Sequence, residues 1–158
     1  MYLNALEFLE EEREAWRPFE ALDALSDEQL ERPISETNDW SGRDVMAHLV
    51  AWLNDALDAA RELAVGEGSP TMERSRRDFA ARGDEINAEI QATWRDLPLA
   101  EVRRRFRETP GELRGYLTVV PETRWVKNAD HLRFFHVYTI EHYEDHVADL
   151  EAILDLAA

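Results

Sequence analysis

The chain has 158 residues and a formal net charge of −16, from 18 basic and 34 acidic side chains. Nucleic acids and anionic membrane surfaces attract basic proteins, so this charge argues against both as partners. Because the chain has no cysteine, disulfides, thiolate metal sites and a cysteine nucleophile are excluded. The apolar content of 44% is enough for a core, and one domain over residues 1–158 is expected.

The first residues have neither the basic start nor the long apolar run of a signal peptide. No segment approaches the roughly 20 apolar residues that a membrane span requires. A cytoplasmic protein is therefore the default expectation.

The first helical pattern covers residues 2–24. Its expected inner face consists of large apolar side chains, namely Leu3, Leu6, Leu9, Trp16 and Phe19. Pro18 lies within this pattern and predicts a kink or an early end. Ser26 and Gln29 form a capping box that predicts a short helical turn, and residues 31–39 are typical of a connection.

The segment from Trp40 to Asp44 predicts the start of the second helix. Ser41 can accept a hydrogen bond from the amide of Asp44, while the Asp44 carboxylate reaches back to the amide of Ser41. Trp40 and Val45 have the spacing of a hydrophobic staple. We expect this helix to run to about Val65, where the sequence VGEGSP ends it.

A third helix is expected over residues 71–96, with Gly83 as its weak point. Its inner face is marked by Phe79, Ile86, Ile90 and Trp94. Residues 97–98, Leu-Pro, indicate a break, after which an amphipathic helix follows. The segment Thr109–Glu112 is a further capping box with Pro110 at the first helical position, which predicts a separate helix from that point.

The last predicted element is one long helix over Asp130–Leu154, preceded by a loop over residues 121–128. No period-two alternation predicts a strand. The fold class is therefore all-α. We expect a four-helix bundle with an extra short helix and a split third and fourth helical region.

Three histidines are candidates for a metal site. His142 and His146 are four residues apart, so their rings project from the same side of the last helix. His48 lies on an apolar stripe near the start of the second helix. If the two helices face each other, the three imidazoles can converge, as in catalytic zinc, nickel or iron sites that keep an open position.

A second interpretation treats these residues as ordinary histidines of the core or surface. The sequence HYEDH lacks the glutamate of the H-E-x-x-H motif, and two histidines at this spacing often arise by chance. The carboxylates of Asp44, Glu141 and Asp145 are close enough in sequence to hold the rings by hydrogen bonds. His131 and His136 fall off the stripe of the pair.

Other side chains are candidates for the surroundings of the site. Trp52 and Tyr138 could line a pocket beside the metal or belong to the core. Asn87 has a low helix propensity and could be a polar pocket residue or an exposed one. The basic run Arg103–Arg107 could attract an anion, or it could be a solvated face that balances nearby acids.

Three motifs carry a resemblance to a known family: WSGRDVMAHLVAW, DEINAEIQATWRDLPLAEVRRRF and HYEDH. In this order they resemble the DinB-like superfamily of four-helix bundles, from Trp40 to Leu150. The superfamily includes the N-terminal domain of mycothiol-dependent maleylpyruvate isomerase and the ClbS/DfsB group. The resemblance implies a divalent metal, often zinc or nickel and otherwise iron or manganese, held by His48, His142 and His146.

The resemblance also implies a reaction class. Several members use the metal for transfer or isomerisation with a low-molecular-weight thiol, and the ClbS type hydrolyses a reactive toxin. We therefore expect a metal-dependent enzyme that acts on a small electrophilic substrate. A protein that only binds or sequesters a small molecule, and a helical module that forms homodimers, are the alternatives.

Overall fold

The computed structural model describes residues 1–158 and contains helices but no β-strand. The long helices are α1 (Ala5–Trp16), α3 (Gly42–Val65), α4 (Pro70–Arg95) and α5 (Leu99–Val119). A C-terminal run comprises α6 (Ala129–His136), the π-helical η4 (Val137–Glu141), α7 (His142–Asp145) and α8 (Val147–Ala157). The short elements are η1 (Arg17–Ala24), α2 (Asp27–Glu31), η2 (Ser35–Thr37) and η3 (Glu122–Arg124).

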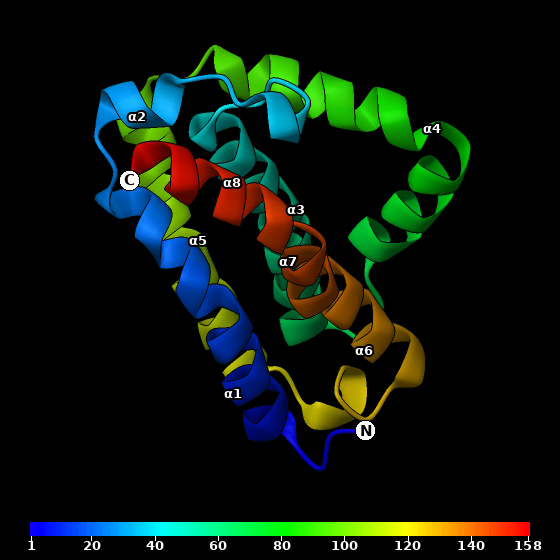
Figure 1. Cartoon of the computed structure of the whole chain (residues 1–158). Helices are drawn as coiled ribbons and strands as arrows, with labels where there is room; N and C mark the ends of the chain where they lie inside the picture. Colours follow the sequence, from blue (N-terminus) through cyan, green and yellow to red (C-terminus); the bar gives the residue numbers. More distant parts are fainter.

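Helix α3 lies at the centre of the bundle. It packs against α5, against α4 and against the C-terminal run, and α1 packs beside α5 and η4 (Figure 1). One apolar core of 33 buried residues joins these helices. The predicted all-α class and four-helix bundle are confirmed. None of the helices combines the length and the apolar character needed to cross a bilayer.

The predicted helix boundaries at the two early capping boxes are correct. Ser26 and Gln29 close the box that opens α2, and Ser41 and Asp44 close the one that opens α3. Helix α1 ends at Trp16, just before Pro18, and continues as a 3₁₀ helix. These ends were predictable because each depends on side chains within four residues of the backbone that they cap.

The predicted inner face of α1 is wrong in its first half. Leu3 and Leu6 are 79% and 64% exposed, whereas Phe8 and Glu12 are buried. The side chains that face the core follow the series 8, 12, 16 and 19, which is a regular helical stripe. The stripe is hard to recognise in the sequence because Glu12 lies in the middle of it, and a buried carboxylate is rare unless it is paired.

The predicted separate helix at Thr109 is also wrong. Helix α5 continues from Leu99 through Pro110 to Val119, so Thr109 lies inside a helix. A proline removes one backbone hydrogen bond, but Phe106 before it and Leu113 after it are both buried in the core. The packing of α5 against α3 therefore keeps both halves of the helix together.

Helix α4 is bent where the sequence indicated weakness. Arg82, next to Gly83, has non-helical angles of φ −144° and ψ 30°. After this bend the second half of α4 crosses the top of the view in Figure 1 towards α2 and α5. The C-terminal run is π-helical at η4, and its helical angles are interrupted at His146, where φ is −107° and ψ is 7°.

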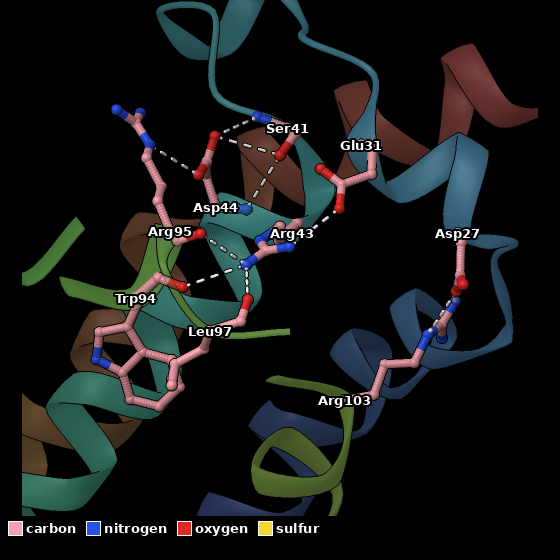
Figure 2. A network of polar contacts seen from close by, with 9 residues as sticks. All are labelled: Asp27, Glu31, Ser41, Arg43, Asp44, Trp94, Arg95, Leu97 and Arg103. Carbon is pink, nitrogen blue, oxygen red and sulfur yellow. Dashed lines mark hydrogen bonds and ion pairs between the residues drawn. The ribbon is translucent and has the colours of Figure 1, made fainter. Parts of the chain in front are cut away.

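A polar network holds the start of α3 against the end of α4 (Figure 2). The Arg43 guanidinium donates to the carbonyl oxygens of Trp94, Arg95 and Leu97 and pairs with Glu31 at 3.1 Å. The carbonyls of Trp94 and Arg95 belong to the last turn of α4 and have no partner within the helix, and Leu97 follows in the connection to α5. Arg43 therefore supplies the C-terminal cap of α4 and fixes the position of α3 relative to it.

We expect Gly42→Ala to destabilise the protein by about 1–2 kcal/mol, because a small-to-large change in a packed core forces neighbours to move. A Cβ at this position would lie 2.9 Å from Leu30 Cδ2 and 3.4 Å from Ile153 Cγ2. Gly115→Ala is the control, since nothing lies within 4 Å of its Cβ, and in a helix interior it should stabilise by about 0.5–1 kcal/mol. Urea unfolding measures both, and shifts of equal sign would contradict the packing at Gly42.

Candidate metal centre

Two segments that are far apart in sequence bring three histidines together. His48 lies one turn after Asp44 in α3, His142 begins α7, and His146 stands between α7 and α8. The Nε2 atom of His142 is 3.0 Å from that of His48 and 3.1 Å from that of His146. One nitrogen from each ring lies within 4.8 Å of the other two.

The hydrogen bond of His146 determines which of its ring nitrogens faces the cluster with a lone pair. Its Nδ1 is 2.7 Å from Oδ2 of Asp149, so Nδ1 carries the proton and donates to the carboxylate. The Nε2 atom of His146 is then an acceptor, aimed at His142. A carboxylate behind a histidine in this way is the usual support of a metal ligand.

The His142 Nε2 atom lies between two other Nε2 atoms. A single N–H at this atom can be well aligned with only one of them, because a ring nitrogen carries one proton in the plane of the ring. The cluster therefore directs lone pairs at a common centre and not into a complete set of hydrogen bonds. Three imidazole nitrogens within 4.8 Å of one another fit a divalent ion such as zinc or nickel.

Burial keeps the rings of His48 and His142 neutral. His48 and His142 are each 4% exposed, and their Nδ1 atoms have no hydrogen-bond partner. Burial, together with the nearby His146, lowers the pKa of His48 to about 4. Burial, and then the neighbouring histidines, lowers the pKa of His142 to about 2. Neutral imidazoles have the free lone pairs that metal binding requires.

Aromatic side chains enclose the cluster. The ring of Trp52 stacks on that of His142, with centroids 3.8 Å apart and an interplanar angle of 12°. Trp40 packs edge-on against His48, with ring centroids 5.1 Å apart. Tyr138 packs against Trp52, with ring centroids 4.8 Å apart. These contacts restrict the orientation of two rings and keep water away from them.

The other predicted site residues lie in different places. Asn87 is half-buried on α4, and its Oδ1 has no partner. The Asp44 carboxylate belongs to the cap of α3 and to an ion pair with Arg95 at 3.5 Å, and it makes no bond to a histidine (Figure 2). Asp145 is exposed and bonds to none of the rings. His131 and His136 lie outside the cluster and bond to Arg124 O and to Glu141.

Sequence reasoning did not identify Asp149 or Gln91. Asp149 is three residues after His146, a spacing that could have indicated its contact with the ring. Gln91 is buried on α4, donates to the carbonyl of Asp44 at 3.4 Å and leaves its Oε1 without a partner. The π-helical turn before His142 has no signal in the sequence, although such turns are frequent at functional sites.

A buried charge network anchors α7 on its other side. The Tyr143 hydroxyl, next to His142, donates to Oε1 of Glu12 at 2.9 Å. The second carboxylate oxygen of Glu12 pairs with Arg114 at 2.5 Å, with side chains that are 2% and 16% exposed. The network thus connects α1, α5 and α7 directly behind the histidine pair.

Asp55 lies one turn after Trp52 in α3, and burial changes the pKa of its carboxyl group. Burial raises the pKa of its carboxyl from 3.8 to about 6, although Arg74 acts in the opposite direction. The folded protein therefore holds this proton more tightly than the unfolded chain, and stability is lost as the pH rises through the window from 3.8 to about 6.

We expect Asp55→Asn to raise the free energy of unfolding at pH 7 by about 1 kcal/mol, less than the full shift because the side chain is partly exposed. The variant should also lose part of the decline in stability between pH 4 and pH 6. Urea unfolding across this range measures both effects. Asp84→Asn, at an exposed residue of α4 that makes no ion pair and does not act on Asp55, is the control and should change neither quantity.

Comparison with known protein families finds one family model that matches this chain. Residues 9–134 match the family model described as the mycothiol maleylpyruvate isomerase N-terminal domain, a DinB-like family. The match begins in α1 and ends in α6, so it includes His48 and stops before His142 and His146. Searches among curated proteins and among solved structures find no significant match.

Proposed function

Because the chain belongs to the family of mycothiol maleylpyruvate isomerase N-terminal domains, we propose that it is a metal-dependent enzyme that joins a thiol co-substrate to a small electrophile. The convergence of three imidazole nitrogens within 4.8 Å is the observation that carries this proposal. The chain has no cysteine, so the reacting thiol comes from a second small molecule. Transferases and isomerases of this class both require such a thiol.

The residues have distinct tasks in this proposal. His48, His142 and His146 hold one divalent ion, and Asp149 fixes the ring of His146 in the tautomer that can bind it. A bound ion would supply Lewis-acid chemistry, lowering the pKa of a thiol or water. Trp52 and Trp40 hold the rings of His142 and His48 in place and exclude water.

Metal analysis of protein purified without chelators or an affinity tag is the first test. We expect one zinc or nickel ion per chain, or uptake of one equivalent on titration, because three convergent imidazoles form a site of high affinity. Failure to bind or take up zinc, nickel, iron or manganese would rule out the proposal.

Turnover is the second test. Mycothiol and monochlorobimane should give the fluorescent thioether and chloride faster with the metal-loaded protein than without it. Thermal stabilisation by monochlorobimane with no product would instead favour the binding or sequestering protein.

A further inference from the structure

A cavity behind Trp52 has this ring in its lining and none of the three histidines of the cluster. Its volume is about 500 Å³, and side chains from α3, α4, α6 and η4 line it. Small-molecule sites commonly have volumes of this order, with mostly apolar walls and few polar groups. The Trp52 ring is a shared wall, because it lines the cavity and stacks on His142 at 3.8 Å.

Four of the nine residues that line the cavity are aromatic. Tyr138 lies 4.8 Å from Trp52 and stacks on Phe134 at 4.2 Å with an interplanar angle of 22°. Phe79 packs against Trp52 at 5.3 Å and edge-on against Tyr138 at 6.4 Å. The rings come from four different elements and pack on one another, so they present a flat aromatic ligand with several faces and edges for stacking.

Two guanidinium groups line the cavity without a partner. Arg76 comes from α4 and Arg133 from α6, and neither makes an ion pair or a side-chain hydrogen bond. This is unusual in a chain with net charge −16, where most arginines are paired; even Arg77, beside Arg76, pairs with Asp78 at 3.3 Å. Asp130 is the only carboxylate in the lining, and it lies beyond ion-pair distance of both arginines.

We propose that this cavity binds a small aromatic molecule that carries one carboxylate. The rings stack on its aromatic part, and Arg76 and Arg133 bind the carboxylate, since guanidinium groups pair with carboxylates through two parallel hydrogen bonds. Asp130 disfavours a second negative charge. That this molecule is the substrate of the adjacent centre rests on the proposed function, but the binding does not.

Calorimetric titration of the full-length protein with 2-naphthoate tests the cavity, with and without added zinc. We expect one saturable site per chain, and a dissociation constant raised about tenfold by Arg76→Ala and by Arg133→Ala, as for loss of a charged hydrogen bond. The neutral 2-naphthylmethanol should bind about tenfold more weakly than 2-naphthoate. Arg77→Ala is the matched control and should leave the dissociation constant unchanged, because this exposed side chain does not line the cavity.

The proposal would be overturned by no saturable binding of 2-naphthoate, by equal binding of the alcohol, or by unchanged binding in the variant with both arginines replaced. Binding that appears only with zinc and ignores both arginines would also overturn it, because the carboxylate would then be at the histidine centre. Naphthoate binding that depends on the arginines in a protein that takes up no metal would support the cavity and reject only the enzyme. Metal-dependent turnover without naphthoate binding would support the enzyme and reject the cavity as a binding site.

Discussion

Replacing His142 with alanine will abolish tight metal binding. Its Nε2 atom lies within 3.1 Å of both other ring nitrogens, so the substitution removes the central donor of the cluster. Loss of a supporting residue alone weakens metal sites by 10- to 100-fold, so loss of a ligand should weaken this one by at least about 100-fold. Competition with a chromophoric chelator measures the affinity for zinc.

His136→Ala is the matched control for this experiment. His136 belongs to the same C-terminal run and bonds to Glu141, but it lies outside the cluster. Its replacement should leave zinc affinity within about twofold of the parent, since a distant surface change has little effect. Equal zinc affinity in both variants and the parent, with circular dichroism showing folded protein, would exclude the three-histidine site.

Replacing Glu12 with alanine will lower the free energy of unfolding by about 3–5 kcal/mol. The Glu12 carboxylate is the shared partner of the Arg114 guanidinium and the Tyr143 hydroxyl, and all three groups are buried or nearly so. Its loss leaves a charge and a hydroxyl without a partner in the core, which is the costly way to break a buried ion pair. Urea unfolding, followed by circular dichroism, measures the change.

Two further variants separate the loss of the Glu12 charge from the general effect of a substitution in α1. Glu10→Ala, at an exposed residue of the same helix, should change stability by less than about 0.5 kcal/mol. Glu12→Gln keeps an acceptor for Tyr143 but leaves Arg114 without its counter-charge, so its effect should lie between those of the other two. An unfolding midpoint of Glu12→Ala equal to that of Glu10→Ala would show that the network contributes no stability.

The limits of the sequence are clearest in α1 and α5. Glu12 looked like a surface residue because its partners, Arg114 and Tyr143, are more than 100 positions away in the chain. Pro110 looked like a helix start because the local pattern favours one, while the buried neighbours of α5 keep the helix continuous. In both cases long-range packing overrides a local preference.

The cavity behind Trp52 shows the same limit for binding. Arg76 and Arg133 are ordinary charged residues of separate helices in the sequence, 57 positions apart, and nothing in it distinguishes them from the paired arginines. They become notable because the fold places both beside four aromatic rings and leaves neither within ion-pair distance of a carboxylate, Asp130 in the same lining included. Only the arrangement of α4 against α6 and η4 reveals this.

By itself, the sequence determined where most helices begin and end, the all-α class and the family, since caps, breaks and apolar periodicity act within a few residues. It also supplied His142 and His146 at adjacent turns. The tertiary structure alone decided that His48 joins them and that Asp149 supports the cluster. Their meeting depends on how α3 packs against the C-terminal run, and that packing is the combined result of a core whose members lie throughout the chain.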